Sequence, residues 1–253
     1  MDNIRWLCKY GSAFNNRLLI NIKTGRDMAN PNFVKTRFAP LEEHGDVEFR
    51  LIPNDPKLHE LAGFLEGLSS LKSTRDDEIT FYAHTKGVRK AVVECSQLEQ
   101  TSVRQWRNRM YDECLSNPER IEAVFIPKQA TSFFVKKPVA AAGCFLCKGQ
   151  YGKHFAGTYY WVRHSLLFTR DWEKIPTSRF GPEEYIAIQF QSKELHCLRK
   201  VKDPLHVTFY SEISATYRCQ KCGPFEAAAD DKVRCPRCKR QTSFVEKIND
   251  MGF

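Results

Sequence analysis

The sequence predicts an α/β domain over residues 1–212, followed by a small cysteine-rich module over residues 213–253. Segments with strand and helix patterns alternate through the first part, which is typical of an α/β fold. Four of the ten cysteines fall in the last 35 residues, as two Cys-x-x-Cys pairs. A chain of 253 residues has room for one or two domains.

The apolar pattern predicts the elements in order. Residues 58–71 repeat apolar side chains with the helical period, and with strands expected at 47–52 and 79–83 they predict a strand–helix–strand unit. A helix is expected after Gly181-Pro182, because Glu183 and Glu184 in its first turn suit the helix dipole. The other expected elements are strands at 17–23, 121–126, 139–146, 155–162 and 205–210, and a helix at 97–115.

Charge and hydropathy limit which classes of protein and ligand fit this sequence. No run approaches the roughly 18 apolar residues of a membrane span, and residues 1–9 have no apolar core for a signal peptide. We therefore expect a cytoplasmic protein, or at most one held at the inner membrane face by surface charge. The net charge of +9 favours polyanions, nucleotide phosphates or acidic membranes, but it selects none of them.

The two cysteine pairs predict a structural zinc site. Tetrahedral zinc needs four converging thiolates, and two Cys-x-x-Cys turns separated by twelve residues supply them. With four cysteines bound, no position is left for a catalytic water. Iron binding or a redox dithiol is the alternative. The predicted ligands are Cys219, Cys222, Cys235 and Cys238.

The module around these cysteines resembles a zinc ribbon. Residues 217–240 carry seven cations and three anions, a charge of +4 that falls to +2 once four thiolates and one Zn²⁺ are counted. Such a module binds nucleic acid or partner proteins, or only caps a domain. Cys144 and Cys147 form a third pair, but an extended strand points them to opposite faces, so we expect them to pack rather than to share a metal.

A polar cluster follows the apolar strand predicted at 79–83. It consists of His84, Thr85, Lys86 and Gly87. Ligands of open α/β sheets bind beyond the carboxyl ends of the strands. This cluster is therefore a candidate site for an anionic ligand, and the alternative is a solvated turn.

Three further polar clusters follow along the chain. Trp106 and Arg107 lie on the predicted 97–115 helix, and the stretch from His154 to Arg163 contains Gly157 and Trp161. The last cluster runs from Arg179 to Glu183. Together the clusters offer cations, histidines, aromatic rings and a candidate carboxylate base.

The four clusters, in this order, resemble a poorly characterised group of glycosyltransferase-like proteins with the GT-A nucleotide-sugar-binding fold. The resemblance covers roughly residues 14–188 and none of the cysteine module. Two positions depart from the family pattern, namely Thr158 in place of Asn and Tyr160 in place of Trp. Metal-dependent GT-A enzymes hold Mg²⁺ or Mn²⁺ with an Asp-x-Asp motif, and this sequence has His84 at the corresponding place. A divalent cofactor is therefore possible, but no Asp-x-Asp motif supports it.

The resemblance implies transfer of a sugar from a nucleotide-sugar donor to an acceptor of unknown kind, whether glycan, protein or lipid-linked. Lys86 and His84 would stabilise the leaving diphosphate, and Glu183 would be the base, although it can equally be a helix N-terminal charge. The remaining implied substrate-binding residues are Thr85, Gly87, Arg107, His154, Gly157, Trp161 and Arg163.

Two of these residues have a structural alternative: Trp161 can be core, and His154 can brace its loop. The alternative function is a non-enzymatic module that binds nucleic acid or protein through its basic surface and zinc ribbon. A glycosyltransferase fold that has lost its activity and is kept for interaction is a third hypothesis.

Overall fold

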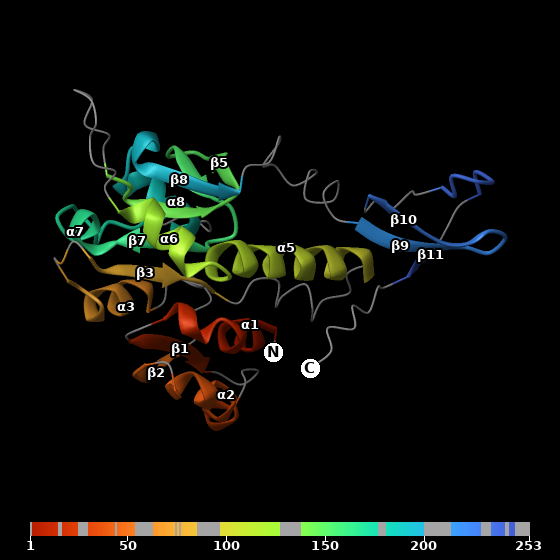
Figure 1. Ribbon diagram of the computed structural model, residues 1–253. Coiled ribbons are helices and arrows are strands. Elements are labelled where there is room, and N and C mark those ends of the chain that lie inside the picture. Colours follow the sequence, from red (N-terminus) through yellow and green to blue (C-terminus); the bar gives the residue numbers. More distant parts are fainter. Residues whose placement is uncertain are drawn as a thin grey trace. The chain divides into compact units, whose positions relative to one another are not determined.

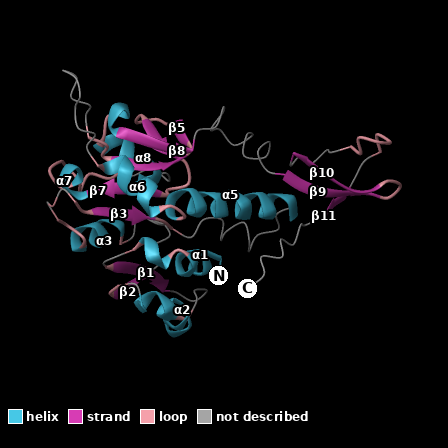
Figure 2. Ribbon diagram, viewed as in Figure 1, coloured by secondary structure: helices cyan, strands magenta, loops and turns pink. Residues whose placement is uncertain are grey.

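The computed structural model describes most of the chain (Figures 1 and 2). The described residues are 2–14, 17–24, 30–43, 45–53, 63–73, 75, 77–84, 97–126, 138–176, 181–199, 214–228, 234–240 and 243–245.

The chain divides into two compact units. Unit 1 comprises Met1–His84 and Met110–Lys200, and unit 2 comprises Thr85–Arg109 and Val201–Phe253. The predicted boundary after residue 212 lies outside the described residues and stays a prediction.

Unit 1 begins with a parallel strand pair. β1 (Leu18–Thr24) pairs with β2 (Val47–Pro53), with Leu18 opposite Val47. A parallel pair needs a crossover connection, and the link contains α2 (Pro31–Phe38) and the 3₁₀ helix η2 (Ala39–Glu43). Before β1 come α1 (Asp2–Lys9) and the 3₁₀ helix η1 (Gly11–Ala13).

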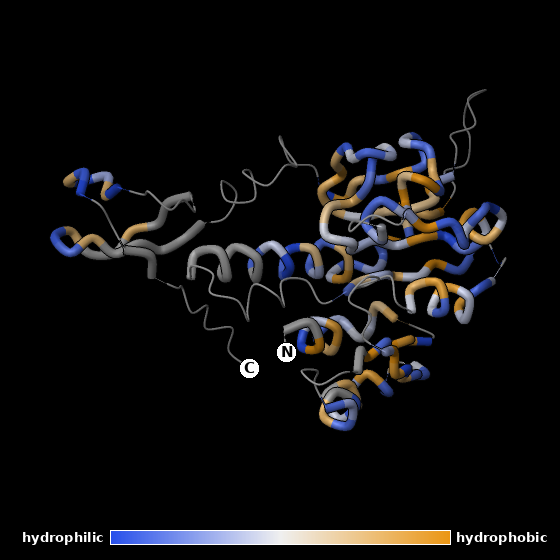
Figure 3. Tube along the Cα trace, turned by 180° about the vertical axis from the view of Figure 1, so that it is seen from behind, coloured by the Kyte–Doolittle hydropathy of each residue, from blue (hydrophilic) through white to orange (hydrophobic). Residues whose placement is uncertain are grey.

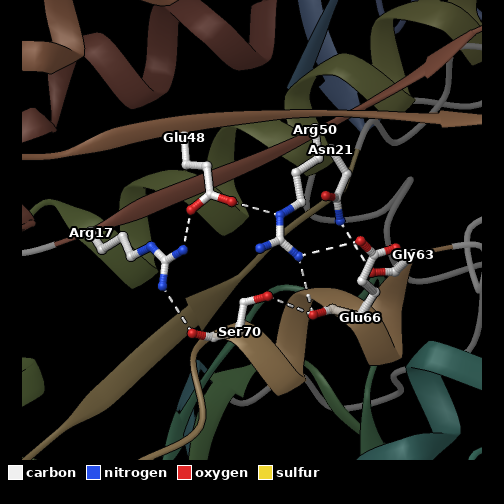
Figure 4. A network of polar contacts seen from close by, with 7 residues as sticks. All are labelled: Arg17, Asn21, Glu48, Arg50, Gly63, Glu66 and Ser70. Carbon is white, nitrogen blue, oxygen red and sulfur yellow. Dashed lines mark hydrogen bonds and ion pairs between the residues drawn. The ribbon is translucent and has the colours of Figure 1, made fainter.

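A polar network joins this pair to α3 (Phe64–Ser70), as Figure 4 shows. Glu48 on β2 accepts from Arg50 Nε at 2.7 Å and also pairs with Arg17, and the two guanidinium groups lower its pKa. Arg17 in turn donates to the Ser70 carbonyl at 2.9 Å, and Asn21 donates to the Gly63 carbonyl at 3.2 Å. The network ties the face of the strand pair to both ends of α3.

The main sheet of unit 1 has four strands in the order β3-β7-β4-β8. β4 runs parallel to β8, and β7 is antiparallel to both β3 and β4. A hairpin of β5 and β6 extends from β4. The bounds are β3 (Ile79–Tyr82), β4 (Ala141–Cys144), β5 (Leu146–Lys148), β6 (Lys153–Phe155), β7 (Tyr160–Arg163) and β8 (Leu195–Arg199).

Among the described residues, four further α-helices and one 3₁₀ helix remain, and residues 97–109 of the first of them belong to unit 2. α5 (Gln97–Leu115) has the predicted bounds, and α8 (Gly181–Gln189) begins where the sequence predicts. α6 (Pro118–Phe125), α7 (His164–Leu167) and the 3₁₀ helix η4 (Ser192–Glu194) were not predicted.

The strand predicted at 121–126 is wrong, because these residues belong to α6. Asn117 caps this helix by accepting from the Arg120 backbone N–H at 2.8 Å, and Pro118 occupies a first-turn position. Ile121 and Phe125, one turn apart, are buried. The β-branched residues Ile121, Val124 and Ile126 favour a strand. The Asn117 cap and Pro118 instead start a helix here.

Two other predicted strands are each divided in two. Phe145 has a φ of 55°, which ends β4 and separates it from β5. The stretch 155–162 turns at Gly157 and Thr158, between β6 and β7. The predicted strand–helix–strand unit is also absent as a paired unit, because β2 and β3 belong to different sheets of the described structure.

The core of unit 1 is rich in aromatic rings. Phe64 packs edge-on against Tyr185 of α8, with ring centroids 5.1 Å apart, and against Tyr82 of β3 at 4.7 Å. Tyr160 and Phe155 are buried in the same cluster. In Figure 3 the strands of this unit carry hydrophobic stretches. This core therefore holds β3, β7 and α8 together.

The described part of unit 2 includes a three-stranded antiparallel sheet, in the order β10-β9-β11. Its strands are β9 (Ser214–Cys219), β10 (Gly223–Ala228) and β11 (Ser243–Val245). The mixed α/β class with a terminal cysteine module is confirmed. The described strands form small sheets, so a GT-A fold stays a prediction.

Some predictions fall outside the described residues, namely the first part of the 58–71 helix and the strand at 205–210. Among the helices that the structure describes, none is long and apolar enough to cross a membrane.

Candidate functional site

The first candidate residue is His84, which lies just beyond the end of β3. Its backbone carbonyl accepts a hydrogen bond from the Tyr159 hydroxyl at 2.9 Å, and the two rings lie 6.3 Å apart. Thr85, Lys86 and Gly87 lie outside the described residues. The structure therefore fixes where this motif begins.

The turn between β6 and β7 supplies the second part of the site. Gly157 has a φ of 86°, a left-handed conformation that glycine adopts without strain. Thr158 follows with a φ of 62°, which is a true outlier for a β-branched residue. Its side chain is fully buried, and its hydroxyl has no hydrogen-bond partner in the described structure. The turn therefore stores strain next to the predicted site.

The start of α8 supplies the third part. The Tyr160 hydroxyl donates to the Pro182 carbonyl at 3.4 Å, which ties α8 to β7. Glu183 and Glu184 follow, and their environments differ. Glu184 is 6% exposed and accepts from the Gln150 backbone N–H at 3.1 Å, whereas Glu183 is only partly buried.

The β5–β6 hairpin holds His154 against a thiol. Cys147 and His154 are cross-strand partners, and Cys147 Sγ lies 3.2 Å from His154 Nε2. Burial and the nearby negative charge of Glu183 raise the pKa of Cys147 to about 11. The thiol is therefore protonated at neutral pH and can donate to the imidazole. His154 is nine-tenths buried, so its observed contact matches the bracing alternative.

Gly149 makes this packing possible. A Cβ at this position would lie 2.5 Å from His154 Cε1 and 3.0 Å from Glu184 Oε1. Only glycine fits there, because the histidine ring and the glutamate carboxylate occupy the space. The hairpin and the first turn of α8 are thus packed directly on one another.

Two predicted substrate-binding residues have structural contacts. Trp161 is buried and donates from its indole to the Cys114 carbonyl at 2.8 Å. Arg163 is buried, donates to the Val139 carbonyl at 3.2 Å, and also contacts the Phe125 carbonyl and ring. Trp161 also packs against Phe81 of β3, with ring centroids 5.2 Å apart.

Arg107 is partly buried on α5 and, with Trp106, belongs to unit 2. It therefore does not enter the group of residues that unit 1 brings together. Arg179 lies outside the described residues.

The four-cysteine cluster is the second candidate site. Cys219 and Cys222 flank the turn from β9 to β10. Cys235 and Cys238 lie on a second turn, closed by a hydrogen bond from the Lys239 N–H to the Cys235 carbonyl at 2.8 Å. Arg237 joins the two turns by donating to the Cys222 carbonyl at 3.1 Å.

The geometry of the four thiols fits zinc. Zn–S bonds of about 2.3 Å in a tetrahedron imply sulfur–sulfur distances of about 3.8 Å. The four sulfurs lie within 4.8 Å of one another, and those of Cys219 and Cys238 are 3.5 Å apart. Cys144 and Cys147 have different partners, since Cys144 Sγ lies 3.7 Å from Cys114 Sγ. This observation agrees with the prediction that they pack.

The sequence analysis missed the Cys147–His154 contact and the role of Glu184. The signal was present in Gly149 and Gly152, which are turn residues between two short apolar stretches and indicate a hairpin. A hairpin across them places residues 147 and 154 opposite one another. The prediction of a single strand at 139–146 does not allow for this pairing.

Together these features define an α/β protein with a C-terminal four-cysteine centre consistent with a zinc ribbon. No family model, curated protein or solved structure matches the chain.

Proposed function

We propose that this protein is a glycosyltransferase that moves a sugar from a nucleotide-sugar donor to an acceptor. One observation supports the proposal most. Three segments that the sequence singles out, at His84, at Gly157–Thr158 and at the start of α8, are tied to one another by the Tyr159 and Tyr160 hydroxyls. Residues 75 and 22 positions apart in sequence thus contact each other around the end of β3.

The chemistry requires stabilisation of a leaving diphosphate. As the acceptor oxygen bonds to the anomeric carbon, the bond to the diphosphate breaks and its electron pair leaves with the phosphate oxygen. Fixed cations and donors stabilise this charge. We assign this role to Lys86 and His84, with Thr85 and Gly87 as further donor ligands.

Glu183 is the proposed general base, which removes the acceptor hydroxyl proton. Its neighbour Glu184 accepts from the hairpin backbone and is buried, whereas Glu183 is more exposed. This difference favours Glu183 for a role that needs access to an acceptor. The acceptor is a glycan, a protein or a lipid-linked molecule.

Zinc, when bound by the four cysteines, supplies structural stability, since four thiolates fill its coordination sphere. We propose that transfer is metal-independent or needs only weakly held Mg²⁺ or Mn²⁺, because the sequence offers His84 where an Asp-x-Asp would hold the cation. If activity were lost with EDTA and restored only by Mn²⁺, the metal-independent form would be wrong.

A thermal-shift panel of sugar nucleotides tests the proposal. We expect at least one of them to raise the Tm, because a ligand that binds only the folded state stabilises it. Lys86→Ala should remove the shift, and Lys174→Ala, which changes an exposed lysine in the loop between α7 and α8, should keep it. A panel without any shift would contradict the proposed function.

A further inference from the structure

The two cysteine turns of the zinc centre present a dense group of cations. Lys221 lies in the first turn, and Arg234, Arg237, Lys239 and Arg240 lie in the second, all of them exposed. We call these five residues the knuckle surface. Figure 3 shows hydrophilic stretches at both turns. The sequence has no Asp or Glu from 219 to 222 or from 232 to 240.

The cations exceed what the metal centre needs. Four thiolates and one Zn²⁺ carry a net charge of −2, and five cations bring the two turns to +3. None of the five makes an ion pair within the part of the chain that the structure describes. Neutralising the zinc–thiolate centre therefore accounts for only two of the five cations.

The cations are held on a rigid frame. The second turn is closed by hydrogen bonds between Cys235 and Lys239 and between Cys235 and Arg240, at 2.8 and 2.9 Å. Arg237 links it to the first turn through the Cys222 carbonyl. With zinc bound, the side chains project from fixed backbone positions, which lowers the entropy lost when a ligand binds.

We propose that the knuckle surface binds the phosphate backbone of a nucleic acid. Three of the five cations are arginines, whose planar fork matches phosphate oxygens. Binding at a membrane surface relies on apolar anchors beside the cations. Among the exposed residues of the two turns, only Gln220 and Pro236 are uncharged. With phosphate contacts alone, binding is independent of sequence. This inference goes beyond the proposed transferase activity.

The test measures binding of the zinc-loaded full chain to a fluorescent single-stranded DNA of about 20 nucleotides, by anisotropy over a range of salt. The variant carries Lys221→Gln, Arg234→Gln, Lys239→Gln and Arg240→Gln, and it keeps Arg237 because that residue links the turns. Each phosphate contact contributes about −0.7 to the slope of log K against log salt. We expect the slope to fall by about three in magnitude and the affinity at low salt to fall at least about tenfold.

A matched control separates the knuckle surface from net charge. It replaces four exposed lysines of unit 1 by glutamine, and these are Lys148, Lys153, Lys174 and Lys193. We expect less than about a twofold change for this control. Zinc content and Tm must match the wild type in both variants. If the fourfold variant loses zinc, Arg240→Gln alone should reduce the slope by about 0.7.

Three results would overturn the inference: no binding by the wild type at low salt, equal weakening by the control, or a preference for vesicles of anionic lipid over the DNA. Because the probe contains no sugar nucleotide, a failed donor panel leaves this test unaffected.

Discussion

At the scale of single residues, unit 1 contains a strained residue at the candidate site and a buried histidine at the other end of β7. Thr158 has a left-handed backbone and a buried hydroxyl without a described partner. His164, at the start of α7, contacts two residues of the β3 edge: Thr80 Oγ1 lies 2.5 Å from its Nε2, and Glu78 Oε2 lies 3.2 Å from its Nδ1. Thr158 precedes β7 at the candidate site, whereas His164 follows β7 at its opposite end, beside the start of β3.

Thr158→Asn should stabilise the protein. Asparagine tolerates the left-handed region better than a β-branched residue, and strain of this kind costs on the order of 1–3 kcal/mol. Removing about 1 kcal/mol of it would raise the Tm by about 2–4 °C for a domain of this size. Differential scanning calorimetry measures the shift, with Thr158→Ser as the control that keeps the hydroxyl and should gain less. A lower Tm for Thr158→Asn would show that the buried hydroxyl matters more than the backbone.

The environment of His164 makes stability depend on pH. Burial lowers the pKa of His164, although Glu78 opposes the shift. Because the folded pKa is below the unfolded one, the unfolded chain binds more protons, and stability is lost as pH falls from the unfolded value through the folded one. Among the described residues, Glu78 pairs with His164, and Arg75 pairs with Glu78 in turn.

We therefore expect a lower Tm at about pH 5 than at about pH 7, and a smaller difference in His164→Gln, whose amide can still accept from Thr80. Thermal melts at both pH values provide the measurement. His196→Gln, which changes an exposed histidine on β8, is the control and should keep the wild-type difference. An unchanged difference in His164→Gln would rule His164 out as the source.

At the scale of elements, the sequence predicts a helix or strand correctly where one local signal is strong and no other signal competes with it. The helix predicted at 97–115 is α5 with the same bounds, and the acidic first turn after Gly181-Pro182 predicted the start of α8. α6 was missed, although Asn117-Pro118 is a helix-start signal, because the short apolar run 121–126 is also compatible with a strand. β8 was missed because its pattern, Leu195 to Arg199, is short and interrupted by polar residues.

The cysteine module should depend on its metal. Structural zinc contributes about 10–16 kcal/mol of binding free energy to folding in small zinc peptides. We expect about one Zn²⁺ per chain by elemental analysis, and its loss in Cys235→Ser. Cys8→Ser, which changes a cysteine on α1, should retain the metal. Zinc-free wild type would contradict the assignment, and iron in its place would support the alternative metal.

At the scale of the whole molecule, the sequence predicts the α/β class but not the pairing of its strands. Which strands lie side by side depends on contacts far apart in sequence, such as β3 with β7 and β4 with β8. Nothing in residues 79–82 alone selects Tyr160–Arg163 as their partner. The candidate site also depends on contacts between distant residues. The order of the motifs predicts a common site, but the Tyr159 and Tyr160 hydrogen bonds that connect its segments cannot be predicted from the sequence.

The central claim is that three motif segments form one donor site. Hydrogen–deuterium exchange, with and without the sugar nucleotide that raises the Tm most, tests it directly. We predict that one ligand slows exchange together in peptides covering 79–87, 154–160 and 181–185, while the four-cysteine module is unchanged. Protection confined to one of these peptides, or to the cysteine module, would contradict the claim.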